Sequence, residues 1–229
     1  AWAYESLTFG GYWVWDPVEN ASLVPWLMMV AGLHTNLVYK SSGCSLKSTY
    51  IFYILSFSLV LYSTFLTRSG ILGDTSVHAF TEQDMTVQLV CFILVFFVPA
   101  MILYFYRSKK IPSIKKEESS YSREFWMFIG ALVLCLSSLI ITAKTSIPVY
   151  NKIFGANVAE PEDRVFSYNQ IQVFIAIIIG VLSAVTQYFK YKNTDKKVFF
   201  KKILTPTIIA LVISLCISLI GNINYDDKG

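Results

Sequence analysis

Long apolar runs separated by short polar connections are the dominant pattern of the sequence. Six of these runs are long enough, at about 17 to 25 residues, to cross the hydrocarbon core of a bilayer as helices. They fall near residues 21–40, 50–66, 87–106, 125–143, 169–189 and 203–221. The strict alternation of a membrane β-barrel strand is not seen. The pattern predicts an all-α membrane protein with about six transmembrane helices, forming one domain over residues 1–229.

The composition agrees with a membrane protein. Hydrophobic residues make up 55% of the chain and charged residues 15%, whereas soluble domains have roughly 25% charged residues. The mean hydropathy is +0.53. The four cysteines are too scattered to indicate a disulfide framework or a zinc site, and small core residues are the simpler interpretation.

The first apolar run has a clear helix start. In Asp16-Pro17-Val18-Glu19, Asp16 is a typical N-cap, proline occupies the first helical position and Glu19 can reach back to the cap. Pro25 removes one backbone hydrogen bond inside the run. We expect a kink there, dividing the segment into a short tilted piece, Pro17–Val24, and a deeper piece that ends near Tyr39.

The distribution of the 19 Lys and Arg residues predicts the orientation in the membrane. Most of them lie in the connections around residues 40–47, 107–123 and 190–202, and short basic connections stay on the cytoplasmic side. The segment 1–26 and the connections 67–86 and 144–168 are then outward-facing, and we expect these outer loops to be structured. The net charge of +4 therefore reflects topology and does not indicate a nucleic-acid partner.

The segment 1–26 is rich in aromatic residues and should lie at the outer interface, where Trp and Tyr rings are enriched. Trp13 and Trp15 are two residues apart, so in an extended segment both indoles face the same way. They could form one wall for a flat amphipathic ligand such as haem, and an interfacial aromatic belt is the simpler alternative. Gly10-Gly11 would allow the backbone to approach a ligand closely.

Three further polar residues are candidates for a haem site. His34 lies within the first span, where an imidazole needs a partner: it could ligate haem iron, or hydrogen-bond Thr35, Asn36 or a neighbouring helix. His78 could rise from the outer loop to ligate iron, or be a solvated loop residue. Arg68 could bind a haem propionate with bidentate geometry, or extend to lipid headgroups.

Taken together, these segments resemble the CcmF/CcsA family, the haem-handling membrane proteins of cytochrome c maturation. The resemblance is carried by GGYWVWDPVENASLVPW over residues 10–26, by His34, by TFLTRSGIL over residues 64–72 and by SVHAF over residues 76–80. The first of these is similar to the tryptophan-rich "WWD" signature of that family. The match is dense over residues 1–80 and weaker beyond.

The resemblance implies roles for individual residues. Trp13, Trp15 and Asp16 would belong to an outward-facing haem platform, and His78 would be one of two outer histidines that ligate the delivered haem. His34 would ligate a second, b-type haem inside the membrane. The family pairs each of these histidines with another, and this chain has only two histidines. The sequence thus resembles the middle portion of such a protein, with partner histidines expected before Ala1 and after Gly229.

The implied function is haem binding on the outer face of a bacterial cytoplasmic membrane, as part of a haem lyase. Haem vinyl groups would be joined by thioether bonds to the thiols of apocytochrome c. The implied partners are apocytochrome c, other cytochrome c maturation membrane proteins or a haem chaperone, and membrane lipids. Two alternatives remain open: a transporter or exporter that moves haem across the bilayer, and a structural membrane subunit anchored by its aromatic residues.

Overall fold

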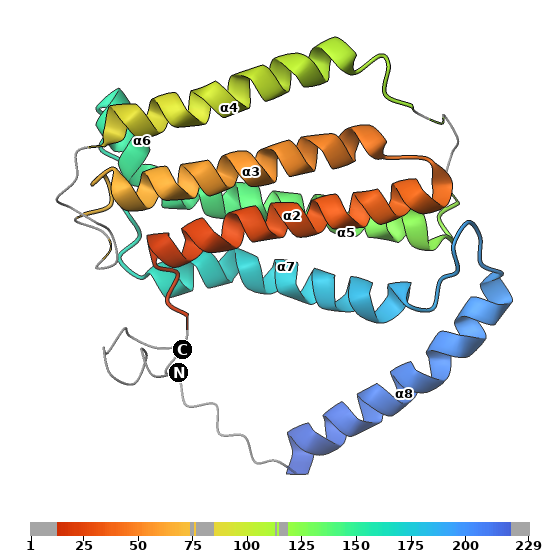
Figure 1. Cartoon of the computed structure of the whole chain (residues 1–229). Helices are drawn as coiled ribbons and strands as arrows, with labels where there is room; N and C mark the ends of the chain where they lie inside the picture. Colours follow the sequence, from red (N-terminus) through yellow and green to blue (C-terminus); the bar gives the residue numbers. More distant parts are fainter. Residues whose placement is uncertain (1–12, 74–75, 77–84, 113, 115–118, 221–229) are drawn as a thin grey trace, which may run out of the picture.

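The computed structural model describes residues 13–73, 76, 85–112, 114 and 119–220. These residues form only helices and no strand (Figure 1). The helices are α2 (Pro17–Ser42), α3 (Leu46–Arg68), α4 (Thr86–Arg107), α5 (Arg123–Thr145), α6 (Ile147–Phe154), α7 (Arg164–Thr186) and α8 (Lys196–Ile220). All except the short α6 are long and apolar enough to cross a membrane. The prediction of an all-α, multi-pass membrane protein with six spans is confirmed.

The six spans match the predicted runs closely, but the polar residues at their ends also join the helices. α7 begins at Arg164, five residues before the predicted run, because the Asp163 side chain accepts a hydrogen bond from the Phe166 amide and caps it. The segment 144–168 was expected to be a loop. It contains α6, which begins with a proline at its second position and ends at the left-handed Gly155.

α2 is the central helix of the bundle and packs against α3 on one side and α5 on the other (Figure 1). α7 packs on α5, and α4 packs on α3. The core between α2, α3 and α5 includes Met28, Ala31, Phe52, Ala131 and Ile141. Small residues such as Ala31 and Gly32 allow the helices to approach closely. Close packing of this kind holds membrane helices together, because the hydrophobic effect does not drive their association in lipid.

The capping box predicted at the start of α2 is confirmed, and Pro25 lies inside the helix, where a kink was predicted. α2 is one continuous α-helix from Pro17 to Ser42. Pro25 has no amide hydrogen to donate to the Ala21 carbonyl, and the Ser63 hydroxyl of α3 donates to that carbonyl instead. The Ser56 hydroxyl donates to the Pro25 carbonyl over 3.0 Å. Hydroxyls from α3 therefore hydrogen-bond two carbonyls of α2, that of the proline and that of the residue one turn before it.

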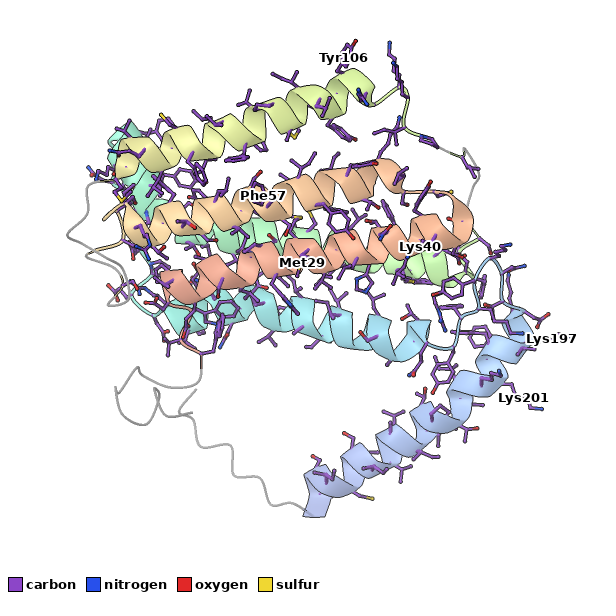
Figure 2. The ribbon with its side chains drawn as sticks, in the orientation of Figure 1. Met29, Lys40, Phe57, Tyr106, Lys197 and Lys201 are labelled. Atoms are coloured by element: carbon purple, nitrogen blue, oxygen red, sulfur yellow. The ribbon has the colours of Figure 1, made fainter. Side chains whose placement is uncertain are left out.

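Most of the basic residues lie at the end of the bundle opposite the start of α2. Lys40 on α2, Tyr106 near the end of α4, and Lys197 and Lys201 on α8 all lie at this end (Figure 2). The side chain of Glu124, 1% exposed, accepts hydrogen bonds there from the Ser41 hydroxyl at 2.6 Å and from the Lys192 amide. Glu124 thus ties the ends of α2 and α5 to the connection between α7 and α8.

Candidate functional site

The segment Trp13–Asp16 is fixed to the start of α2 by two carboxylates. Asp16 is the N-cap, and its side chain accepts a hydrogen bond from the Val18 amide at 3.0 Å. The Glu19 carboxylate accepts hydrogen bonds from the amides of Asp16 and Val14, both at 3.2 Å. Glu19 therefore reaches beyond the usual capping box and holds the peptide between the two tryptophans.

Asp16 also anchors the outer loop that follows α3. The Ser76 hydroxyl donates to Asp16 Oδ2 over 2.8 Å, and both residues are buried, at 6% exposed. The carboxylate of Asp16 is therefore engaged in organising the tryptophan segment and the loop. His78, two residues after Ser76 in the sequence, lies outside the described residues.

Trp15 is held in place from three helices. Its Nε1–H donates to Asn169 Oδ1 over 2.9 Å, and its ring stacks on Tyr168 of α7, with centroids 5.0 Å apart and planes 7° from parallel. Asn20 of α2 donates from Nδ2 to the Trp15 carbonyl at 3.0 Å and to the Thr145 hydroxyl of α5 at 3.2 Å. The Thr145 and Tyr168 hydroxyls lie 3.0 Å apart and share a hydrogen bond.

The backbone of Trp15 explains why so many contacts converge on it. Its φ is +56°, in the left-handed region that non-glycine residues rarely adopt. Such a conformation persists where the surroundings over-determine it, and it is often found at binding sites. Residues from α2, α5 and α7 supply that constraint, so the indole position is set by the folded bundle.

The expectation of one flat wall formed by Trp13 and Trp15 is wrong. Because the backbone turns at Trp15, the segment is not extended, and the two rings meet edge to face at 89° with centroids 5.9 Å apart. The pair forms a corner. Trp15 is the fixed side, stacked on Tyr168, and the half-buried Trp13 stands perpendicular to it.

Cations surround this aromatic corner. Lys144 Nζ lies 5.0 Å from the centre of the Tyr168 ring and donates to the Ser167 hydroxyl at 2.8 Å. Arg164 pairs with Glu160 at 3.2 Å. The space enclosed between Trp15, Lys144, Arg164 and Tyr168 is about 20 Å³, which is too small for a macrocycle. Arg68 is the last residue of α3, at the same end of the bundle, and its side chain is exposed.

His34 lies away from the tryptophan segment, roughly 25 Å along α2 from its first residue, Pro17, at about 1.5 Å per residue. Its Nδ1 is 2.8 Å from the Val30 carbonyl one turn earlier. A carbonyl only accepts, so Nδ1 carries the proton and in the neutral ring Nε2 keeps its lone pair. Of the partners considered from sequence, Thr35 is excluded, because its hydroxyl bonds the Gly32 carbonyl and the Thr49 hydroxyl instead.

His34 lines an open groove of about 210 Å³ between α2, α5 and α7. Its other walls include Trp26, Trp126, Gly130 and Ile179. A cofactor-ligating histidine typically donates one ring N–H to a carbonyl and leaves its other nitrogen for the metal, and the hydrogen bond of His34 to Val30 is compatible with the first of these conditions. The described residues hold no group of three or more His, Cys, Asp or Glu side chains able to bind a metal ion.

Sequence reasoning missed the residues that fix Trp15. Tyr168, Asn169 and Thr145 are more than 120 positions away from it in the chain, and no spacing connects them to the tryptophan segment. Trp126, which lines the groove of His34, was also missed. The one available signal was that Tyr168 and Asn169 follow the acidic helix start at Asp163, on the side predicted to face outward.

The membrane-length helices and the capped tryptophan segment define the class, a multi-pass membrane protein. Residues 1–73 match the family model described as "Cytochrome C assembly protein". The predicted resemblance to the CcmF/CcsA family is confirmed.

Individual relatives are of the CcmF type. The chain is 31% identical to the cytochrome c-type biogenesis protein CcmF of Haemophilus influenzae over 218 residues, which cover 93% of this chain and 32% of the relative. It is 32% identical to CcmF of Escherichia coli, over 79% of this chain and 28% of the relative. It is 38% identical to the cytochrome c-type biogenesis protein CycK of Bradyrhizobium diazoefficiens, over 67% of this chain and 22% of the relative. The chain thus spans about a third or less of the length of these relatives. No solved structure matches it.

Proposed function

We propose that this chain is the haem-presenting region of a cytochrome c maturation protein. It would hold haem at the outer face of a bacterial cytoplasmic membrane for covalent attachment to apocytochrome c, as part of a haem lyase. The names of the relatives, cytochrome c-type biogenesis proteins, support the role in maturation. The basic residues gathered at the end opposite the tryptophan segment support the orientation.

The observation that carries the proposal is the fixed aromatic corner of Trp13 and Trp15. Stacking on Tyr168 and the hydrogen bond to Asn169 hold Trp15 before any ligand arrives. A porphyrin ring could pack against the exposed side of Trp13, with its propionates toward Arg68 and water. Joining haem vinyl groups to two thiols needs chiefly that the reactants be held in register, and haem supplies the reactive vinyl carbons.

The Ser76–Asp16 hydrogen bond connects this corner to the proposed iron ligand. It holds the loop two residues before His78 against the tryptophan segment. An imidazole at position 78 could then reach iron in a macrocycle that packs on Trp13. In this proposal Asp16 positions the loop and does not contact haem.

A second haem is proposed at His34. Nε2 of His34 is available, and the surrounding groove is flanked by two tryptophans. At about 210 Å³ the groove is smaller than the roughly 300–1,000 Å³ of pockets that enclose a whole ligand. It would therefore hold one edge of a macrocycle, and a second axial ligand would come from outside this chain, which has only two histidines.

The outer site is tested in the protein that carries this chain, purified from a strain that makes c-type cytochromes. We expect a haem absorption band that His78→Ala weakens, together with a loss of cytochrome c. Trp13→Leu should also weaken it, whereas Tyr106→Leu, at an exposed aromatic residue of the opposite end of the bundle, serves as the control (Figure 2). Unchanged spectra and cytochrome c yield in His78→Ala and Trp13→Leu would refute the outer site.

The inner site is tested with a ligand variant and a space-filling variant. His34→Ala should shift or remove a b-type haem spectrum. A Cβ at Gly130 would meet no heavy atom within 4 Å, and Gly130 lines the groove, so Gly130→Phe should also displace haem while the protein stays folded. Gly180→Phe, at an equally open glycine outside the groove, is the control. A normal b-type spectrum in both His34→Ala and Gly130→Phe would exclude this site.

The implied partners are apocytochrome c and either other maturation membrane proteins or a haem chaperone. The outer end of the bundle is the surface they would approach, because it carries Trp13 and the loop that contains Ser76. Haem uptake into sealed vesicles containing the protein alone would instead support the transporter hypothesis.

A further inference from the structure

An apolar groove lies between α3 and α4 at the basic end of the bundle. It has a volume of about 320 Å³ and shares no lining residue with the His34 groove. Its walls are formed by Ile54 of α3, by Ala100 and Leu103 of α4, and by Ile111. Tyr50, Tyr104 and Arg107 complete the lining of the groove.

The groove is closed on the side toward the middle of the bundle. Phe57 of α3 and Phe96 of α4 meet edge to face there, with ring centroids 5.7 Å apart. Further along, Leu89 and Ile93 of α4 pack on the core cluster that contains Phe65. The two helices are therefore in contact over the outer half and separate only toward the basic end, as the diverging ribbons of α3 and α4 also show (Figure 1).

The polar groups at the open end have no partner within the described part of the chain. Neither the Arg107 guanidinium nor the hydroxyls of Tyr50 and Tyr104 make a hydrogen bond or ion pair there. Tyrosines in the packed core behave differently: the Tyr62 hydroxyl is 2.6 Å from the Ser146 hydroxyl, and Tyr168 bonds Thr145. A guanidinium and two phenols at the mouth of an apolar groove are donors without an acceptor.

These donors lie in a strongly basic setting. Lys109 and Lys110 follow Arg107 after Ser108, and Lys47 lies in the first turn of α3. Basic residues next to a membrane span attract anionic lipids. A guanidinium binds phosphate oxygens with two parallel hydrogen bonds, so it is suited to a phosphate at the mouth of the groove.

We propose that this groove binds an anionic glycerophospholipid. One acyl chain lies along Ile54, Ala100 and Leu103 and ends at the Phe57–Phe96 contact. The phosphate accepts hydrogen bonds from Arg107 and from the tyrosine hydroxyls. The lipid would fill the space between α3 and α4 where the helices do not touch, and so hold α4 on the bundle.

Native mass spectrometry of the full chain, exchanged into equal amounts of phosphatidylglycerol and phosphatidylcholine, tests the proposal. We expect phosphatidylglycerol to be retained preferentially, and Arg107→Gln to reduce that preference roughly five- to tenfold, as expected for one charge-assisted contact. Ala100→Phe, which fills the apolar part, should abolish retention. Lys40→Gln removes a charge from the same end but outside the groove, and should leave retention unchanged (Figure 2).

Equal retention of the two lipids, or a preference that survives both Arg107→Gln and Ala100→Phe, would overturn the proposal. Circular dichroism confirms that each variant is folded. A photoreactive benzoylphenylalanine at Leu103 identifies the occupant directly: a phospholipid adduct is expected. An adduct with a protein segment would show that a helix occupies the groove.

Discussion

α2 and α4 are both membrane-spanning helices, yet they contribute to the fold in opposite ways. α4 is the more hydrophobic of the two and has no buried residue, whereas α2 is the least hydrophobic span and has eleven. The buried residues of α2 include Asn20, Thr35 and Gly32 as well as apolar ones. Of these two helices, the more hydrophobic one lies at the periphery, and the one with small and polar residues packs against protein.

The physical reason is the solvent. An apolar side chain gains no hydrophobic transfer energy when it leaves the hydrocarbon for the protein interior. Phe and Leu on α4 can therefore remain at the periphery. A hydroxyl or amide in hydrocarbon is costly until it finds a partner. The partners lie on neighbouring helices, as for Thr35 with Thr49 and for Ser137 with Gln172.

The largest loss of stability that tests this comparison is expected for a substitution on the buried face of α2. Met28 is 1% exposed and packs in the core, so Met28→Ala should lower the free energy of unfolding by about 2 to 5 kcal/mol through the cavity it leaves. Its neighbour Met29 is 42% exposed, and Met29→Ala should have little effect (Figure 2). Unfolding in mixed micelles with increasing dodecyl sulfate measures both. Equal losses would mean that α2 has no distinct buried face.

The next largest loss of stability is expected at Glu124, whose carboxylate joins the ends of α2 and α5 to the connection between α7 and α8. Glu124→Ala leaves the Ser41 hydroxyl and the Lys192 amide without their acceptor, and should cost about 1.5 to 3 kcal/mol. Glu162→Ala, at an exposed acidic residue of the opposite end, is the control. The same unfolding titration applies, and a loss no greater than that of the control would show that Glu124 is dispensable for the packing.

A smaller effect is expected where α2 and α3 are closest. A Cβ at Gly32 would lie 2.7 Å from the Tyr53 ring and 3.4 Å from the Phe52 Cβ. Gly32→Leu should therefore force the helices apart and cost about 1 to 3 kcal/mol. Gly180 of α7 has open space around it, so Gly180→Leu should be neutral or stabilising. If both substitutions are tolerated equally in a thermal melt, close approach does not hold α2 and α3 together.

The smallest effect concerns the backbone of α2 beside its proline. Ser63→Ala removes the hydroxyl that bonds the Ala21 carbonyl and should cost about 0.6 to 1.7 kcal/mol. Thr64→Ala removes a hydroxyl that bonds only the Val60 carbonyl of its own helix, and is the matched control. A Ser63→Ala variant as stable as Thr64→Ala would mean that the freed carbonyl needs no partner.

Part of the candidate site could be predicted from the sequence and part could not. Asp16 and Glu19 act within one turn of each other, so their capping role follows from spacing alone. The corner of Trp13 and Trp15 could not be foreseen, because the positive φ of Trp15 depends on residues of α5 and α7. Likewise, the hydrogen bond that the Ala21 carbonyl accepts in place of one from Pro25 comes from a serine of α3.

The sequence by itself determined the six spans, the capped start of α2 and the segregation of basic residues to one end. Each of these depends on neighbouring residues and on the solvent around them, lipid or water. Only the tertiary structure decided which span is central, how Trp15 is held, which nitrogen of His34 is available and where α3 and α4 separate. These features depend on contacts between helices distant in the chain, whose polar groups must find one another because the bilayer offers them no other partner.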